Sequence, residues 1–248
     1  MTTAAAERIK REAEFHDQRF GSTEKRAADA FYVVAQQAYR EYDKQIVADV
    51  AGLSVLELGA GIESRAFMLA AAGAKVSGID ISPVAVEQSQ REAERLGLSC
   101  RFEVMNAEDL TYANASFDRV CGAGILHHLS LKASYAEIAR VLKPGGKATF
   151  VEPLGHNPVI NLYRNRTPEQ RTPDEHPLLT KDFQEAKNYF KSVQTRCFHL
   201  ASLAALPFRR MKHFETVLRI LDRVDAVILS DRSPLRWGAW MVVVTLEA

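Results

Sequence analysis

The side chains best suited to acid–base chemistry are histidines at two places in the chain. His127 and His128 stand together in GILHHLS, and His156 follows in EPLGHNP. Imidazole is the usual general base near neutral pH, because its unperturbed pKa is about 6.5. These three histidines are therefore candidate catalytic residues, although His127 and His128 are equally suited to shaping a site by packing or hydrogen bonding. The histidines expected to be structural are His16, His199 and His213.

A second group of ionisable side chains lies in the segment RTPDEHPL. Arg171 and His176 stand there with two acids between them, inside a proline-rich stretch at 154–178. Long connections in compact domains are commonly lids or binding loops. We therefore interpret Arg171, His176 and His156 as candidates for binding an acceptor substrate, with a solvated polar loop as the alternative. The spacing matches no usual ligand pattern, so no metal site is expected.

A pair of glycines supplies a candidate ligand cradle. In VLELGAGIES an apolar run ends at Gly59 and Gly61, after which a helix is expected. Such a turn lets the backbone approach a ligand closely, and the helix offers free N–H groups. Asp80 ends the next apolar run, KVSGID, and a carboxylate there can accept hydrogen bonds from ribose hydroxyls. A dinucleotide fits this pattern, and so does a nucleoside with a zwitterionic tail, but Ser64 replaces the third glycine of the dinucleotide fingerprint.

Short apolar runs alternate with helical patterns through the middle of the chain. Strands are expected at LSVLEL, KVSGID, CRFEVM, SFDRVCGA and KATFVEP, with helices at SRAFMLAAAG, PVAVEQSQREAERLG and LKASYAEIARVLK. This alternation predicts an α/β fold with a doubly wound, mostly parallel sheet. Further along, KDFQEAKNYF is expected to be a helix, VQTRCFHL and WMVVVTLE two more strands, and 205–230 an amphipathic helical pair.

The overall composition excludes several classes of protein. The chain has 248 residues, with 32 Lys and Arg against 31 Asp and Glu, so its net charge is +1 and no nucleic-acid partner is expected. No apolar run is long enough for a transmembrane helix, and the start turns charged too early for a signal peptide. Three scattered cysteines, expected to be buried and unpaired, favour a cytoplasmic location: Cys100, Cys121 and Cys197.

Five segments between Val55 and Pro153 follow one another in a characteristic order: VLELGAG, the acid of SGID, NAEDL, SFDRVCGAGILHHL and EIARVLKPGGKATFVEP. In these segments the chain resembles the class I S-adenosylmethionine-dependent methyltransferases of the small-molecule type, which include the ubiquinone and menaquinone methyltransferases. The resemblance implies a Rossmann-like sheet of seven strands whose last strand is antiparallel. It also implies S-adenosylmethionine as cofactor, S-adenosylhomocysteine as product, and in-line methyl transfer to oxygen, nitrogen or carbon of a small hydrophobic metabolite.

The resemblance also implies a set of cofactor-binding residues. Glu57 would support the glycine turn under the methionine and ribose groups, and Asp80 would bind the ribose hydroxyls. Glu63 departs from the glycine that the family often has, and its carboxylate could crowd that of the ligand. Gly122 and Ala123 would line the methionine side, and Asn106, Ala107 and Glu108 would meet the adenine edge. In chain order, the implied residues are Glu57, Gly59, Ala60, Gly61, Asp80, Ile81, Asn106, Ala107, Glu108, Gly122 and Ala123.

One domain is expected over residues 1–248. Its N-terminal helices would form a lid, and Tyr32, Tyr39 and Tyr42 of this lid would close over the cofactor. The expected parts are the lid at 1–48, a cofactor-binding core at 53–153, acceptor-side lid segments at 154–190 and 201–230, and the last two strands at 191–200 and 237–247. The stretch 201–230 is either a cover on the sheet or an apolar, basic-rimmed wall for a lipid-like acceptor at a membrane surface.

Two other functions stay open at this point. One is an NAD(P)-dependent oxidoreductase, against which Ser64 and the NAEDL segment argue. The other is a methyltransferase-like module that binds the cofactor without catalysis, which Glu63 favours. An RNA methyltransferase is disfavoured by the neutral charge and by the lack of a basic tract with interleaved aromatic residues. The acceptor and the oligomeric state are left open.

Overall fold

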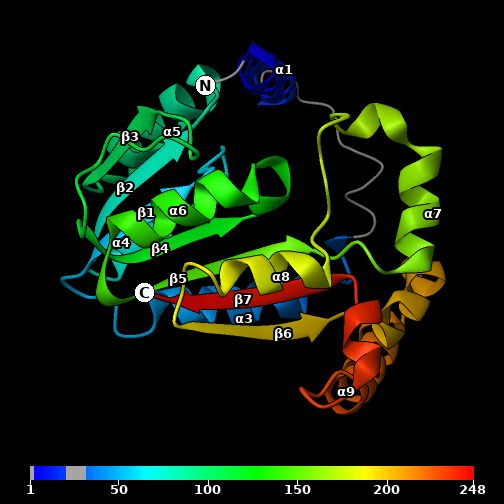
Figure 1. The fold of residues 1–248 in the computed structure, drawn as a ribbon. Coiled ribbons are helices and arrows are strands. Elements are labelled where there is room, and N and C mark those ends of the chain that lie inside the picture. Colours follow the sequence, from blue (N-terminus) through cyan, green and yellow to red (C-terminus); the bar gives the residue numbers. More distant parts are fainter. Residues whose placement is uncertain (1–2, 21–31) are drawn as a thin grey trace.

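The computed structural model describes residues 3–20 and 32–248, and its centre is one seven-stranded sheet (Figure 1). The strands cross the sheet in the order β3-β2-β1-β4-β5-β7-β6, and β7 runs antiparallel to both of its neighbours. The predicted α/β fold, a mostly parallel sheet with an antiparallel last strand, is confirmed. The strands are β1 Ser54–Leu58, β2 Lys75–Asp80, β3 Cys100–Val104, β4 Phe117–Ala123, β5 Leu142–Pro153, β6 Ser192–Phe198 and β7 Met241–Glu247.

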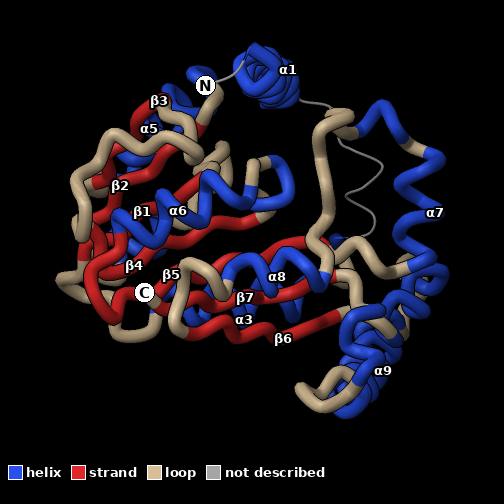
Figure 2. The backbone as a smooth tube through the Cα atoms, viewed as in Figure 1, coloured by secondary structure: helices blue, strands red, loops and turns tan. Residues whose placement is uncertain are grey.

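Helices cover both faces of this sheet, as Figure 2 shows by colour. In the view of Figure 1, α6 and α8 lie in front of the sheet and α3 lies behind it. Their bounds are α3 Gln36–Val47, α4 Ala66–Ala71, α5 Pro83–Leu96, α6 Leu131–Val141 and α8 Thr180–Ala186. The layers are therefore those of a doubly wound α/β fold.

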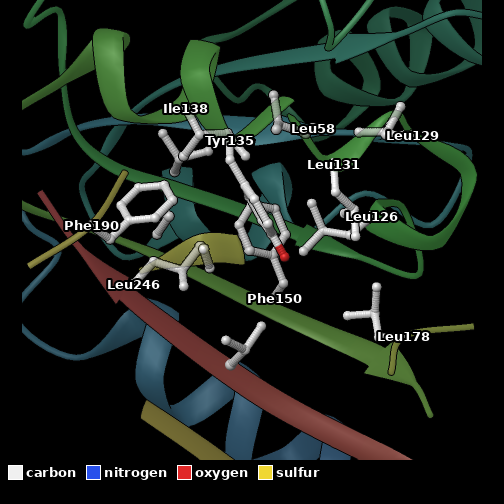
Figure 3. Packing of buried hydrophobic residues seen from close by; sticks show 14 of the residues in the cluster. Leu58, Leu126, Leu129, Leu131, Tyr135, Ile138, Phe150, Leu178, Phe190 and Leu246 are labelled. Carbon is white, nitrogen blue, oxygen red and sulfur yellow. The ribbon is translucent and has the colours of Figure 1, made fainter. Parts of the chain in front are cut away.

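Two hydrophobic clusters fill the layers, one on each face of the sheet. Tyr135 of α6 and Phe150 of β5 belong to the cluster in Figure 3. Tyr42 of α3 and Leu69 of α4 belong to the other. Strand β1 contributes to both, because successive side chains of a strand point to opposite faces.

Local signals in the sequence explain where the central elements begin and end. Ser82 caps α5 by accepting a hydrogen bond from Ala85 N, Pro83 occupies its first position, and Gly97 ends it in a left-handed conformation with φ 66°. After β1, Gly59 and Gly61 both have positive φ, at 64° and 55°. The tight turn that was expected here does need glycine.

Two further helices lie near the carboxyl ends of the parallel strands. They are α1, Thr3–Phe20, which Figure 1 places beyond the arrowhead of β2, and α7, Pro158–Arg166, which it places beyond those of β4 and β5. The stretch 154–178 was expected to be irregular because of its prolines, so α7 is a correction. Asn157 caps α7 by accepting from Val159 N and Ile160 N, and proline is favourable at a first helical position. A 3₁₀ turn, η2, follows at Pro168–Gln170.

The stretch 201–230 forms a 3₁₀ segment and one helix. They are η3, Ala201–Phe208, and α9, Phe214–Ile228, followed by η4, Pro234–Gly238. Phe214 and Leu218 pack in the same cluster as α3, while Val227 on the outer side of α9 is 74% exposed. In Figure 1, α9 lies beyond the arrowhead of β6, so this stretch covers the end of the sheet and not one of its faces. Contact of its outer side with a membrane surface stays a prediction. Within the described residues, no helix is both long and apolar enough to cross a membrane.

Candidate active site

A cavity of about 900 Å³ lies at the carboxyl ends of β1, β2 and β4, between α1 and α7. This volume suits a small-molecule ligand, and the carboxyl edge of an α/β sheet is where such ligands bind. The predicted site residues that line it are Glu57, Gly59, Ala60, Gly61, Asp80, Ile81, Asn106, Ala107, Glu108, Ala123, His127, His128 and Arg171. Three others do not: Gly122, His156 and His176.

The structure places these three residues in other roles. A Cβ on Gly122 would meet Leu58 O at 2.9 Å, so this glycine permits close packing of β4 against β1. His156 is exposed, and its Nε2 accepts a hydrogen bond from Thr180 N, 3.1 Å away, at the start of α8. The side chain of His176 is exposed, while its backbone N donates to His127 O at 2.8 Å. His156 and His176 therefore differ from the expectation that they face an acceptor.

At one end of the cavity, two carboxylates shape the glycine turn. Asp80 is 8% exposed and accepts from Gly61 N and Ser82 N, each at 2.9 Å. Glu57 accepts from Arg65 N at 2.8 Å, from Ala66 N at 2.9 Å, and from the Ser64 hydroxyl. Burial raises the pKa of Glu57 to about 7, and these donors offset only part of that shift. Glu57 thus holds the turn directly against the start of α4.

Glu108 connects the cavity wall to α1. Both of its oxygens lie 2.6 Å from Arg8 Nη2, and Oε1 also accepts from Ser130 N at 2.7 Å. Arg8 donates through Nη1 to His128 O at 3.0 Å. The carboxylate that was expected to meet adenine is therefore already paired with the helix above it.

His127 pairs with a glutamate that sequence reasoning missed. Glu152, fully buried in β5, accepts from Ile125 N and Leu126 N, each at 2.9 Å, and lies 2.7 Å from His127 Nδ1. When Glu152 is ionised it accepts this bond, and Nδ1 then carries the hydrogen while Nε2 keeps its lone pair. Burial and the nearby His128 lower the pKa of His127 well below its usual range, while burial raises that of Glu152 to about 7. The signal in the sequence that could have identified Glu152 is an acidic residue near the end of the apolar strand KATFVEP.

His128 faces two side chains of α1. Glu12 Oε2 lies 3.1 Å from His128 Nδ1 and 3.6 Å from His16 Nε2, and Thr172 donates its hydroxyl to Glu12 Oε1. Burial raises the pKa of Glu12, but the two imidazoles and the hydroxyl outweigh it, and the net pKa lies well below the usual range. His16 was expected to be structural, yet it lines the cavity. No local sequence pattern in α1 indicates that Arg8, Glu12 or His16 belongs to a functional site.

The three tyrosines of the expected lid separate into two groups. Tyr32 and Tyr39 line the cavity, whereas Tyr42 is fully buried in the core and cannot close over a ligand. On the opposite wall, α7 contributes Tyr163 and Arg164, and burial lowers the pKa of Arg164 to about 10. None of the described residues between 201 and 230 lines the cavity, which differs from the acceptor-side role expected for that stretch.

Three comparisons with known proteins agree with this geometry. Residues 55–146 match the methyltransferase domain family. The ubiquinone biosynthesis O-methyltransferase of Thiobacillus denitrificans is 38% identical over 105 residues, 42% of this chain and 45% of that protein. The demethylmenaquinone methyltransferase of Clavibacter sepedonicus is 35% identical over 119 residues, 47% of each chain. The matches span about half or less of the length of such relatives.

The fold likeness extends over more of the chain than the sequence match. The magnesium protoporphyrin IX methyltransferase of Synechocystis, solved with bound S-adenosylhomocysteine, gives a TM-score of 0.64 at 15% identity, over 97% of this chain and 99% of that one. Identity at that level shows a shared fold and nothing finer. Residues 55–146 match the methyltransferase domain family, and the sheet that contains them shares the fold of this methyltransferase.

Proposed function

We propose that this protein is an S-adenosylmethionine-dependent methyltransferase that acts on a small, hydrophobic acceptor. The observation that carries the proposal is one cavity with two differently built ends. The glycine turn and Asp80 form one end, suited to a nucleoside, and His127, which Glu152 holds from behind, lines another part of the wall. The family match and the cofactor in the related structure support the same cofactor here.

Methyl transfer from a sulfonium needs alignment more than charge stabilisation. The sulfur leaves as a neutral thioether, so the cavity walls must chiefly hold the nucleophile in line with the methyl group. A hydroxyl or carbon acceptor must also lose a proton, and the Nε2 lone pair of neutral His127 would receive it. Glu152 is then a positioning residue, because it fixes the ring through Nδ1. This arrangement favours a hydroxyl or an acidic carbon over an amine as acceptor.

The acceptor would enter on the side of α7. Tyr163, Arg164 and Arg171 line this side, with Ile160 and Trp240 supplying apolar surface. A mixed wall of this kind suits a hydrophobic metabolite with a polar head. One relative is named as an O-methyltransferase of ubiquinone biosynthesis, which is consistent with a hydroxyl acceptor.

A cofactor-binding module without catalysis is the rival proposal. The observation that favours it is Glu63, whose side chain is exposed and lines the cavity beside the glycine turn. A carboxylate there would repel the carboxylate of the cofactor. Replacing Glu63 with glycine would then tighten binding of S-adenosylhomocysteine.

Calorimetry with S-adenosylmethionine, S-adenosylhomocysteine and NAD tests the proposal. We expect micromolar binding of the first two and none of NAD. Asp80→Ala should weaken binding by about tenfold or more, since hydrogen bonds to a charged group contribute about 1.5–3 kcal/mol each. Asp109→Ala, which removes the same charge from an exposed residue outside the cavity lining, is the matched control. NAD binding would favour the oxidoreductase instead, and equal affinities of the Asp80 variant and wild type would remove the ribose assignment.

Turnover is measured separately, with radiolabelled methyl groups and a panel of quinols, phenols and amines. We expect incorporation into a hydroxyl or carbon acceptor and its loss in His127→Gln. Cofactor binding without incorporation into any panel member would favour the non-catalytic module.

A further inference from the structure

We propose that Glu12, His16 and His128 form a binding site for a divalent transition-metal ion such as Zn²⁺, between α1 and the 3₁₀ turn η1, Leu126–His128. The site joins two residues of one helix to one residue of the core. It does not depend on methyl transfer.

The spacing of the three ligand atoms suits one small ion. Glu12 Oε2 lies 3.1 Å from His128 Nδ1 and 3.6 Å from His16 Nε2, and one ligand atom from each residue lies within 4.8 Å of the others. Around a tetrahedral Zn²⁺ with bonds of about 2.0–2.2 Å, neighbouring ligand atoms are roughly 3.3–3.5 Å apart. The separations of Glu12 from the two imidazoles bracket that value. Glu12 and His16 are four residues apart on α1, which puts both on one face of the helix.

Two of these ligand atoms are buried and lack a hydrogen-bond partner within the described part of the chain, and a bound metal ion would supply the missing contact. Glu12 is 4% exposed and His128 is 9% exposed. Although Glu12 Oε2 and His128 Nδ1 are close, neither has a hydrogen-bond partner of acceptable geometry among the described residues. When two side chains coordinate the same ion, their ligand atoms lie close together, but the lone pair of each points at the ion and not at the other atom. Their geometry is then unsuitable for a hydrogen bond between them. Buried polar atoms without a hydrogen-bond partner destabilise a fold, so a third partner is expected.

The neighbouring contacts orient the ligands. Thr172 donates its hydroxyl to Glu12 Oε1, which leaves Oε2 for the ion. Arg8 holds the His128 carbonyl at 3.0 Å and pairs with Glu108 rather than with Glu12. Hydrogen bonds that fix the free oxygen of a ligating carboxylate are typical of metal sites.

In two other clusters of possible metal ligands, hydrogen bonds already engage part of the ligand atoms. In the cluster of His199, Asp222 and Asp225, both ring nitrogens of His199 are engaged, by Ala38 N and the Ser202 hydroxyl, and Asp225 accepts from backbone amides of η3. In the cluster of His127, His128 and Glu175, His127 Nδ1 is bonded to Glu152, and Nε2 is 3.9 Å from Glu175.

A metal at this place would have two consequences. It would connect α1 to η1, because the ligands come from both. Glu12, His16 and His128 all line the cavity, so a fourth coordination position facing it would be open to water or to an oxygen of a bound molecule. The combination of two imidazoles and one carboxylate is one that catalytic zinc sites use.

The test uses the full chain without an affinity tag, stripped with a chelator and then titrated with Zn²⁺ by calorimetry. We expect one ion per chain with micromolar or tighter affinity. Glu12→Gln and His16→Ala should each weaken binding by at least the roughly 10–100-fold that loss of an outer-shell partner of a metal ligand costs. Co²⁺ in place of Zn²⁺ should give the visible spectrum of a four-coordinate site, and His16→Ala should remove it.

Matched controls separate this site from its neighbours. His176→Ala removes an exposed histidine outside the cavity lining and should leave Zn²⁺ affinity unchanged. Affinity lost in Glu175→Gln but kept in His16→Ala would assign the ion to the other cluster and overturn the proposal. So would the absence of stoichiometric Zn²⁺ binding to a folded wild-type chain, because Glu12 and His128 would then be an ordinary ion pair. Circular dichroism of every variant distinguishes lost binding from lost folding.

Discussion

His127 and Glu152 show how burial sets the behaviour of single residues in this cavity. Glu152 accepts two backbone N–H groups in addition to the imidazole, and these donors favour its ionised form. The ring that it holds is desolvated and lies beside a second imidazole, with 4.2 Å between the ring centroids, so its charged form is disfavoured. The pair therefore presents a neutral base with a fixed tautomer.

We expect nitrogen-15 NMR of labelled histidine to find His127 neutral at neutral pH, with its hydrogen on Nδ1. In Glu152→Gln the carboxylate is lost, and the ring should become a mixture of both tautomers. Glu169→Gln, which neutralises an exposed acid on η2, should leave the His127 signals unchanged. A wild-type ring with its hydrogen on Nε2 would contradict the assignment of His127 as a base.

Glu57 should make the stability of the protein depend on pH. Its pKa is raised by burial from the ordinary 4.5 to about 7, so the folded state holds a proton that the unfolded state releases earlier. This contribution is complete below pH 4.5 and is lost as the pH rises through 7. Relative to Glu57→Gln, the unfolding free energy of wild type should therefore fall by at most about 3 kcal/mol over this range. Urea unfolding at several pH values measures the difference, and Glu63→Gln, at an exposed residue, is the control.

An unfolding free-energy difference between wild type and Glu57→Gln that does not change with pH would show that the pKa of Glu57 is the same in the folded and unfolded states. Its hydrogen bonds to the start of α4 would then offset its burial.

At the scale of elements, α1 is attached to the core mainly by polar contacts. Arg8 binds Glu108, Glu12 binds Thr172, and Asp17 accepts from the Ser82 hydroxyl. Segments held by few apolar contacts open at lower free energy than the core, and lids over binding sites are drawn from them. We infer that α1 opens and closes over the cavity.

We expect Arg8→Ala to speed hydrogen exchange in residues 3–20. The substitution leaves the Glu108 carboxylate, 9% exposed at its side chain, without its bidentate partner, so opening of α1 should become roughly 10–100 times more frequent. Arg11→Ala removes the same charge from the same helix. Its ion pair with Asp174 is 48% and 24% exposed, and exposed pairs contribute little.

Equal exchange rates in the Arg8 and Arg11 variants would mean that the Arg8–Glu108 pair does not hold α1. Binding of S-adenosylhomocysteine should slow exchange in the wild type, because the ligand would lie beneath this helix.

At the scale of the whole molecule, one sheet carries two hydrophobic clusters and unites the domain. Phe150 in β5 is fully buried in the cluster that α6 and α8 cover. Each strand places side chains on both faces of the sheet, because successive side chains alternate. Loss of packing on one face therefore also destabilises the strands that support the other cluster. A single cooperative unfolding transition is therefore expected.

Phe150→Ala should lower the unfolding free energy by about 3–5 kcal/mol, because a large buried ring is replaced by a cavity. Urea denaturation followed by circular dichroism measures the loss. Val104→Ala, at a side chain that is 53% exposed, should change it by less than about 1 kcal/mol. Two separate transitions, or a small effect at Phe150, would show that the two clusters unfold independently.

Most of the fold could be predicted because it depends on local order in the sequence. Alternation of apolar runs with helical patterns predicted the parallel strands. Ser82 and Gly97 predicted the two ends of α5. The glycine turn and Asp80 were also predictable, since neighbouring strand ends meet at one edge of a sheet. The one substantial helix that was missed, α7, begins with an asparagine and a proline that also suit a loop.

The sequence by itself thus determined the strands and helices of the core and the residues that follow β1 and β2, because side-chain periodicity is a local property. The antiparallel last strand was implied by the family resemblance. Only the tertiary structure decided which distant side chains meet. Glu152 is 25 residues from His127, Arg8 is 100 residues from Glu108, and His156 turns away from the cavity to cap α8. Such contacts depend on how η1, α1 and α8 pack against the rest of the fold, which is set by complementarity between surfaces that are distant in the sequence.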